Sequence, residues 1–132
     1  MLFLFSMKLK EMNKPITTKA HGIIDYAFAG LQIFGPAILG INKTAGHTYE
    51  ALGTGVLGLN TLTKTSVGLK RIIPLKYHKK TDALILGGMV LLTVTSMIRK
   101  DRKALTFHLF SLSLAAANYF LTDYKKPLRK LR

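Results

Sequence analysis

Two short segments of the sequence carry the same side chains in the same order. Lys19–Gly30 reads KAHGIIDYAFAG and Lys76–Gly87 reads KYHKKTDALILG, and both follow the pattern Lys-x-His-x-x-x-Asp-x-x-x-x-Gly. The chain has only four His residues, and these segments use two of them, His21 and His78. Residues four apart share one face of a helix. Each of these His residues is therefore expected to lie one helical turn from an Asp.

The candidate site consists of the two His–Asp pairs: His21, Asp25, His78 and Asp82. Imidazole and carboxylate groups together suit zinc, iron or manganese, so one interpretation is a metal site. The pattern lacks the Glu that marks the His-Glu-x-x-His helix of metallohydrolases. Carboxylates and imidazoles inside a membrane also exchange protons, so a second interpretation is a proton- or ion-linked site.

A third interpretation of the two pairs is structural, and it is the one we favour. Each pair would fix the start of its helix and bond across to a neighbouring helix, with Asn60 and Asn118 as the expected partners. Lys19 and Lys76 can extend to the surface beside the pairs and support them. Repetition agrees with this interpretation, because a structural device is copied whenever the segment around it is duplicated.

Four stretches of the chain are nearly free of charge, and they are the elements that must position these side chains. Each holds about 16 to 19 residues, close to the length that crosses a bilayer. They cover residues 23–41, 51–62 with a weak extension to about 69, 83–98 and 104–121. Residues 83–98 read ALILGGMVLLTVTSMI, without the charged face of a soluble surface helix. We therefore expect an all-α fold, a four-helix transmembrane bundle.

The repeat extends beyond the two His–Asp pairs. LTKT at residues 62–65 resembles LTDY at residues 121–124, and Pro15 and Pro74 each precede a His. The bundle is therefore predicted to consist of two parallel helical-hairpin repeats, which place both His–Asp pairs at one depth near one membrane face. The expected domains are a flexible basic tail at 1–14, a membrane domain at 15–124 with repeats 15–72 and 73–124, and a basic tail at 125–132.

The charge distribution predicts an orientation and partners. Of the 20 Lys and Arg residues, 15 lie in the N-terminal segment, the middle loop and the C-terminal tail. The positive-inside rule then places both termini in the cytoplasm, as a multi-pass protein of the bacterial inner membrane. The expected partners are anionic lipid headgroups, with a membrane protein partner or a second copy of the chain left open. No nucleic-acid partner is expected, because the basic residues do not follow a helix face.

Composition excludes several kinds of site. The absence of Cys rules out disulfides, thiolate zinc sites and iron–sulfur clusters. No phosphate loop or nucleophile elbow is present, and His47 and His108 do not form a haem-ligating pair at equal depth. We therefore expect no cofactor and favour a non-enzymatic structural or accessory membrane component.

Ala51, Gly55 and Gly58 are expected to allow close helix packing.

The segment HGIIDYAFAGLQIFGPAILG, followed later by RIIPLKYHKKTDALILGG, resembles the SPW-repeat family of small bacterial membrane proteins. That family pairs His-x-x-x-Asp with a Ser-Pro-Trp element later in the same helix. Here the element is reduced to Gly35-Pro36-Ala37 in the first half and Leu92-Thr93-Val94 in the second. The resemblance covers about residues 15–124 and implies four spans and a membrane location. It implies no activity.

Overall fold

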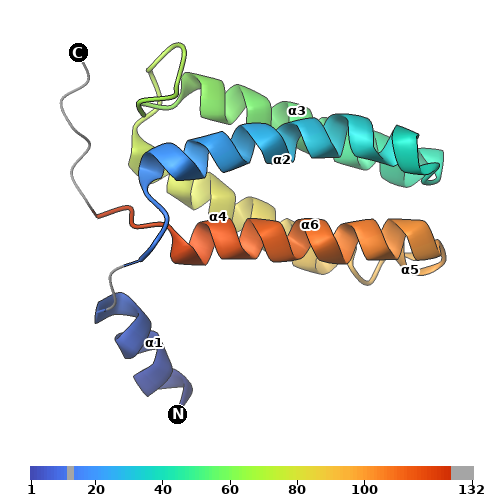
Figure 1. Ribbon diagram of the computed structural model, residues 1–132. Helices are drawn as coiled ribbons and strands as arrows, with labels where there is room; N and C mark the ends of the chain where they lie inside the picture. Colours follow the sequence, from blue (N-terminus) through green and yellow to red (C-terminus); the bar gives the residue numbers. More distant parts are fainter. Residues whose placement is uncertain (12–13, 126–132) are drawn as a thin grey trace.

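The computed structural model describes residues 1–11 and 14–125, and its regular elements in these ranges are α-helices (Figure 1). This confirms the all-α prediction. In chain order the helices are α1 Leu2–Glu11, α2 Thr18–Leu39, α3 Lys43–Leu62, α4 Leu75–Leu92, α5 Ser96–Arg99 and α6 Arg102–Leu121.

Four long helices, α2, α3, α4 and α6, lie alongside one another in two layers (Figure 1). Helix α2 packs against α3 within one layer and against α6 of the other layer, and α6 also packs against α4. The segment before α2, the α3–α4 connection and the segment after α6 lie at one end. The α2–α3 turn and α5 lie at the opposite end, so the two ends can be compared directly.

Side chains outside the helices fix where three of them begin. The side chains of Thr17, Asn42 and Asp101 accept backbone N–H bonds at the first turns of α2, α3 and α6. Ser, Thr, Asn and Asp are the usual residues at this position, because they satisfy N–H groups that have no partner within the helix. Helix α2 ends at Leu39, and the next residue, Gly40, has a φ of 70°, the left-handed conformation that glycine adopts without strain.

The structure corrects the prediction of one continuous helix over residues 83–98. Helix α4 begins earlier, at Leu75, and ends at Leu92, and the chain turns before the short helix α5. The Thr93 hydroxyl donates to a carbonyl one turn back (3.1 Å), and the Thr95 hydroxyl donates to the Leu92 carbonyl (2.7 Å). Such local bonds offer the backbone an alternative to a continuing helix, and they accompany the break.

The N-terminal segment, expected as a flexible basic tail at residues 1–14, is helical over Leu2–Glu11. This stretch consists of Leu, Phe, Ser, Met, Lys and Glu without Gly or Pro, and most of these residue types favour helix. The side chains of Leu2–Phe5 are exposed. Residues 12–13, and residues 126–132 of the expected basic C-terminal tail, lie outside the described residues.

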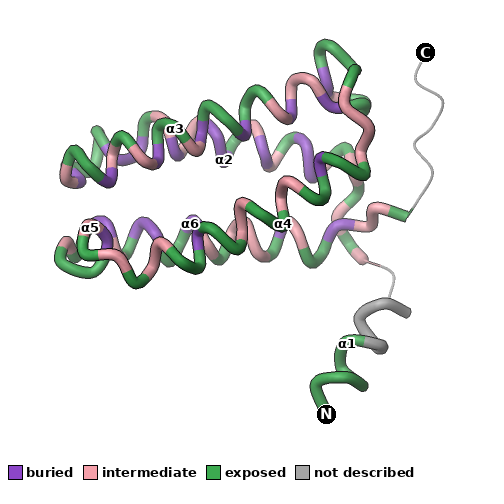
Figure 2. Tube along the Cα trace, turned by 180° about the vertical axis from the view of Figure 1, so that it is seen from behind, coloured by how far each residue is buried: buried purple, intermediate pink, exposed green. Residues whose placement is uncertain are grey.

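Buried and exposed side chains are distributed unusually for a helical protein. Figure 2 shows the buried residues on the inward faces of the long helices and the exposed ones outward. Apolar contacts form two inner clusters, one around Tyr49 and Phe107 and one around Phe28 and Met89. Among the described residues, polar or charged side chains are buried in comparable number: His21, Asp25, Gln32, Asn60, Thr63, Thr65, His78, His108, Ser111, Asn118 and Thr122.

The outward faces are correspondingly apolar. Ile38, Leu84 and Leu91 are 82%, 76% and 71% exposed. Further large apolar side chains are exposed along the same four helices, including Ile23, Phe34, Leu57, Val90, Leu109, Phe110 and Phe120. Two helices, α2 and α6, are long and apolar enough to cross a membrane.

Helices α2 and α3 approach each other closely at Gly53. A Cβ at this position would lie 2.8 Å from the Ala29 carbonyl oxygen and 2.9 Å from the Gln32 Cβ. The prediction that Ala51, Gly55 and Gly58 make the close contacts is wrong. All three are exposed, because they lie on the outward face of α3, away from α2.

Candidate functional site

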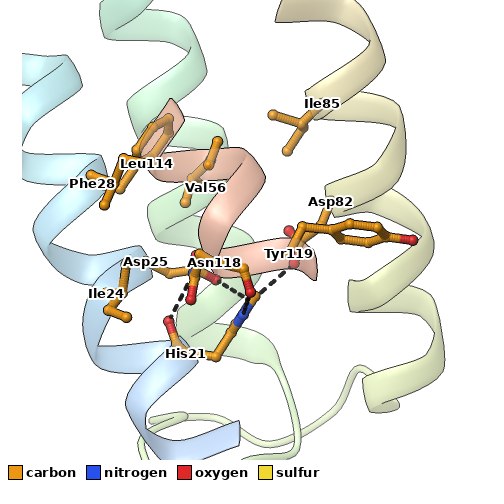
Figure 3. A pocket seen from close by; sticks show the side chains of 11 residues that line it. His21, Ile24, Asp25, Phe28, Val56, Asp82, Ile85, Leu114, Asn118 and Tyr119 are labelled. Carbon is orange, nitrogen blue, oxygen red and sulfur yellow. Dashed lines mark hydrogen bonds and ion pairs between the residues drawn. The ribbon is translucent and has the colours of Figure 1, made fainter. Parts of the chain in front are cut away.

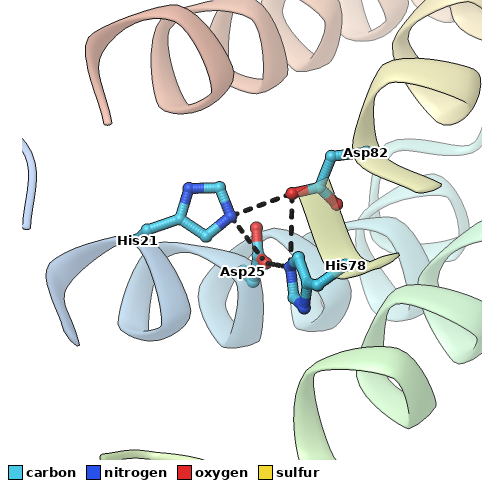
Figure 4. A group of neighbouring side chains, drawn as sticks. All are labelled: His21, Asp25, His78 and Asp82. Carbon is cyan, nitrogen blue, oxygen red and sulfur yellow. Dashed lines mark hydrogen bonds and ion pairs between the residues drawn. The ribbon is translucent and has the colours of Figure 1, made fainter. Parts of the chain in front are cut away.

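The two His–Asp pairs meet between α2 and α4 and form one four-residue ring (Figure 4). One potential ligand atom from each residue lies within 4.8 Å of the other three. His21 Nε2 lies 3.0 Å from Asp82 Oδ2 and 3.2 Å from Asp25 Oδ2. His78 Nε2 lies 3.0 Å from Asp25 Oδ2 and 3.2 Å from Asp82 Oδ2. Each His therefore makes its shorter contact with the Asp of the other helix.

The ring is largely withdrawn from solvent. His78 is 1% exposed, His21 4% and Asp25 7%, and Asp82 is half-buried. Ionised carboxylates are costly to bury unless a positive partner neutralises them. The ring therefore needs positive charge at or beside its centre.

A threonine hydroxyl contacts Nδ1 of each imidazole, the nitrogen that does not face the carboxylates. His78 Nδ1 lies 2.7 Å from Thr63 Oγ1, and His21 Nδ1 lies 2.8 Å from Thr122 Oγ1. Each hydroxyl uses its single proton to donate to the carbonyl four residues back, and it therefore accepts from the imidazole. Nδ1 thus carries a hydrogen in both imidazoles, and Nε2 faces the carboxylates.

The backbone around the ring repeats the same hydrogen bonds at both His residues. Ile16 donates to the Leu121 carbonyl (3.0 Å), and Ile73 donates to the Leu62 carbonyl (2.8 Å). The carbonyl groups of Ile16 and Ile73 in turn accept from residues 123 and 64, each at 2.8 Å. The start of each predicted half is thus tied to the end of the other half, next to the hydroxyls that hold the imidazoles.

The predicted supporting residues have unequal positions. Asn118 donates through Nδ2 to Asp25 Oδ1 (3.0 Å) and therefore supports a ring carboxylate. Asn60 donates to the Gly22 carbonyl (2.8 Å) and ties α3 to α2 beside the ring. Lys19 and Lys76 are exposed, and among the described residues no ion pair joins either of them to the ring.

A small cavity adjoins the ring inside the helices (Figure 3). Its volume is ≈ 30 Å³, which is enough for a water molecule. His21, Asp25, Asp82 and Asn118 contribute its polar lining. Its apolar lining comes from Ile24, Phe28, Val56, Ile85, Leu114 and Ala115. Asn118 Oδ1 is buried without a hydrogen-bond partner.

The remaining two His residues lie elsewhere. His47 is exposed on α3, 3.8 Å from Glu50. His108 is fully buried. Its Nδ1 lies 2.9 Å from the Tyr49 hydroxyl, and its Nε2 lies 2.9 Å from the Met89 carbonyl oxygen.

Two groups outside the long helices have shifted pKa values. Burial, together with the nearby carboxylates, raises the pKa of Tyr124, whose hydroxyl lies 3.4 Å from His21 Nδ1. At the opposite end, hydrogen bonds from the Asn42 amide groups lower the pKa of Asp101. Neither group is placed to neutralise the carboxylates of the ring.

Sequence reasoning missed Thr63, Thr122 and Tyr124 as members of the site. The signal was present in the similarity between residues 62–65 and 121–124, which was interpreted only as a mark of repetition. A hydroxyl that ends a helix is common, and nothing in the sequence shows that an imidazole lies above it. The tertiary contact between the start of one half and the end of the other supplies that information.

Comparison with known proteins adds no relative to this picture. No family model, curated protein or solved structure matches the chain. The function is therefore inferred from the chain's own residues.

Proposed function

We propose that the chain is an integral membrane protein in which α2, α3, α4 and α6 all cross the bilayer as a four-helix bundle. Its role is that of a structural or accessory membrane component without a reaction of its own. The observation that carries this proposal is a partly inverted distribution of side chains. Polar groups are buried in comparable number to apolar ones, and large apolar groups face outward.

That inversion is difficult to reconcile with an aqueous surface. Water favours burial of apolar area by roughly 25 cal/mol per Å², yet side chains such as Ile38, Leu84 and Leu91 point outward. In lipid the preference reverses, because an apolar side chain loses nothing by facing hydrocarbon and a polar side chain must find a partner inside. His21, Asp25 and Asn118 are buried among such partners.

The dimensions of the helices support the same proposal. The four long helices contain 22, 20, 18 and 20 residues, or about 27–33 Å at 1.5 Å per residue, against a hydrocarbon core of about 30 Å. Helix α3 is less apolar because of its Gly and Thr content. Helix α4 carries Lys76, Lys79 and Lys80 in its first turns, where long side chains can reach the headgroups.

The distribution of charge supports an orientation with the ring end in the cytoplasm. The end that holds the segment before α2, the α3–α4 connection and the segment after α6 contains most of the basic residues that the structure describes, and anionic lipid headgroups attract such a surface. A bacterial inner-membrane location, and kinship with the SPW-repeat family, are parts of this proposal. The duplicated hydrogen bonds around Ile16 and Ile73 support an origin from two hairpin repeats.

Within this proposal the ring joins the two hairpins through polar contacts. The shorter contacts join His21 of the first hairpin to Asp82 of the second, and His78 of the second to Asp25 of the first. Helices in lipid gain little from apolar contact with one another, so polar contacts and close packing hold them together. The four-residue ring supplies polar contacts, and the approach of α2 and α3 at Gly53 supplies close packing.

Extraction of membranes tests the location. Membranes from cells that express the full chain are washed with alkaline carbonate, and the pellet and supernatant are compared. The proposal predicts that the chain stays in the pellet and is released only by detergent. Complete release by carbonate would contradict the membrane location.

Labelling of single cysteines tests the orientation, since the chain contains no Cys of its own. Lys70→Cys and Lys100→Cys place exposed thiols at opposite ends of the long helices. A membrane-impermeant maleimide should label Lys100→Cys in intact cells and Lys70→Cys only after permeabilisation. The reverse pattern would overturn the orientation but not the membrane location.

A further inference from the structure

We propose that the ring of His21, Asp25, His78 and Asp82 is a binding site for one divalent transition-metal ion of the zinc class. The inference goes beyond the proposed membrane role and does not depend on it, because it rests on the geometry of four side chains.

The first support is convergence of the donor atoms. Four N–O contacts of 3.0–3.2 Å join the two Nε2 and two Oδ2 atoms. Donor atoms on a tetrahedron around a zinc ion, with bonds of about 2.0–2.1 Å, are about 3.3 Å apart. Four of the six donor–donor distances are therefore close to those of a zinc site, and one potential ligand atom from each of the four residues lies within 4.8 Å of the others.

The second support is the direction of each imidazole. Each Nε2 makes its hydrogen bond to the carboxylate of the other helix at 3.0 Å, and the carboxylate oxygen of its own helix lies only 3.2 Å away. Both carboxylates therefore lie in front of Nε2, the nitrogen that faces the middle of the four residues. The two imidazole centroids are 5.5 Å apart, so two positive imidazolium groups would also repel each other.

The third support is the hydrogen bond that each imidazole makes through Nδ1, on the side away from the carboxylates. The hydroxyls of Thr63 and Thr122 accept from Nδ1, which leaves Nε2 as the nitrogen with a lone pair in a neutral imidazole. His residues that bind metals usually have such a hydrogen bond at the other nitrogen, which fixes the tautomer and the orientation of the ring. Asp25 is held in a similar way, since its second oxygen accepts from Asn118.

The fourth support is an unpartnered group on a residue that lines the adjoining cavity. Asn118 is 4% exposed, and its Oδ1 has no hydrogen-bond partner among the residues that the structure describes. The cavity of ≈ 30 Å³ that it lines also contacts His21, Asp25 and Asp82. A water molecule beside the four donors would fit this space and donate to Asn118 Oδ1, which would satisfy the buried oxygen.

The donor set identifies the class of ion. Two imidazole nitrogens and two carboxylate oxygens suit Zn²⁺, Fe²⁺ and Mn²⁺, and the hard ions Ca²⁺ and Mg²⁺ prefer oxygen alone. Two carboxylates also match the charge of one divalent ion. Zn²⁺ is the probe of choice because it has no redox chemistry.

The experiment measures Zn²⁺ bound by the full chain in detergent. The protein is stripped with a chelator, dialysed against a series of Zn²⁺ concentrations and analysed for metal content. We expect one tightly bound Zn²⁺ per chain, and at least a tenfold weaker affinity in Asp82→Asn, which keeps the shape of the side chain. Co²⁺ should substitute and give the visible absorption bands of a four-coordinate nitrogen–oxygen site.

Two His substitutions outside the ring are matched controls. His108→Gln changes a buried imidazole and His47→Ala changes an exposed one, and both should keep the affinity of the original chain. Helical content is measured by circular dichroism on each variant. If Asp82→Asn does not fold, the Co²⁺ spectrum of the original chain decides, and a spectrum of hexa-aquo Co²⁺ would overturn the proposal.

Other outcomes would also overturn the metal site. The original chain could hold no more Zn²⁺ than His21→Ala/His78→Ala, or His47→Ala could lose as much Zn²⁺ as Asp82→Asn. Either result would leave the membrane role intact, because that role is tested by carbonate extraction and labelling. Conversely, a chain released by carbonate could still bind Zn²⁺ at the ring.

Discussion

The two ends of the helices each bury a histidine-centred polar group, and the two groups are organised differently. At one end, His21 and His78 donate through Nδ1 to threonine hydroxyls and direct Nε2 at two carboxylates. At the other end, His108 donates through Nε2 to the Met89 carbonyl and accepts at Nδ1 from Tyr49. No carboxylate contacts His108 among the described residues.

The comparison shows that burial of a His does not by itself define a site. His108 uses both nitrogens on neutral partners, so nothing at that end calls for a cation, and the group is complete as a packing element. At the ring, His21 and His78 also have a threonine partner. Their Nε2 atoms and the two carboxylates nevertheless face a common point. The tautomer that the neighbours impose makes the difference.

The largest expected difference between the two ends is in stability. Asp25→Ala removes one carboxylate and leaves the remaining buried groups without their partner, which typically costs roughly 3–5 kcal/mol. His108→Gln should cost only about 1 kcal/mol, because an amide can still donate to the Met89 carbonyl. Unfolding in mixed micelles measures both. Equal losses would show that the ring is no more than another buried hydrogen-bond group.

The threonines give a second comparison, because one kind of residue contacts His at both ends. Thr63→Val and Thr122→Val remove the acceptor of Nδ1, and loss of such a partner typically lowers metal affinity 10–100-fold. Thr93→Val changes the neighbour of His108 and should leave Zn²⁺ affinity unchanged. The measurement is Zn²⁺ dialysis, with Thr122→Ser expected to restore affinity. Retention of full affinity in both ring variants would contradict the role of the hydroxyls.

Midway between the two ends, α3 packs against α2 at Gly53, whereas Gly55 of the same helix faces outward. Gly53→Ala forces a methyl group against the Ala29 carbonyl and should destabilise the chain by about 1–3 kcal/mol. Gly55→Ala meets open space and should be neutral or stabilising by up to about 1 kcal/mol, because Ala favours helix. Thermal unfolding in detergent compares the two. Equal effects would mean that α2 and α3 do not approach at Gly53.

The smallest expected effect concerns pH at the end that holds His108. Hydrogen bonds from Asn42 lower the pKa of Asp101 below its ordinary value. The folded state then gains stability above the unfolded pKa, near 3.9, and loses it as the pH falls through the lower folded value. The thermal midpoint of Asp101→Asn should lie slightly below that of the original chain at pH 6, and the two should converge towards pH 3. A constant gap would contradict this assignment.

The sequence predicted much of this architecture and less of its chemistry. The all-α fold and the four residues of the candidate site followed from charge-free stretches and from the repeated spacing around His21 and His78. The break at Thr93–Thr95 was missed, because local side-chain bonds end a helix inside an apolar run without changing its hydropathy. The inward face of α3 was also assigned wrongly, since Gly53 and Gly55 differ only in the direction in which they point.

The halves themselves show how far repetition can be trusted. Ile16 and Ile73 repeat their hydrogen bonds closely, yet Asn60 and Asn118 do not have the same role. Both donate to a backbone carbonyl of α2, and Asn118 also donates to a ring carboxylate. The second helix of each hairpin ends at an equivalent Thr, but Asn60 stands three residues before Thr63 and Asn118 four before Thr122. One residue of offset rotates a side chain by about 100° around a helix.

X-ray absorption at the zinc edge tests the central claim most directly, because it reports the atoms around the ion. The full chain, stripped and reloaded with one equivalent of Zn²⁺, should show a shell of nitrogen and oxygen neighbours at about 2.0–2.1 Å and the outer-shell scattering of two imidazoles. The same sample prepared from His21→Ala/His78→Ala should lose the imidazole scattering. A spectrum of the original chain without imidazole scattering would contradict the convergence of His21 and His78 on a metal ion.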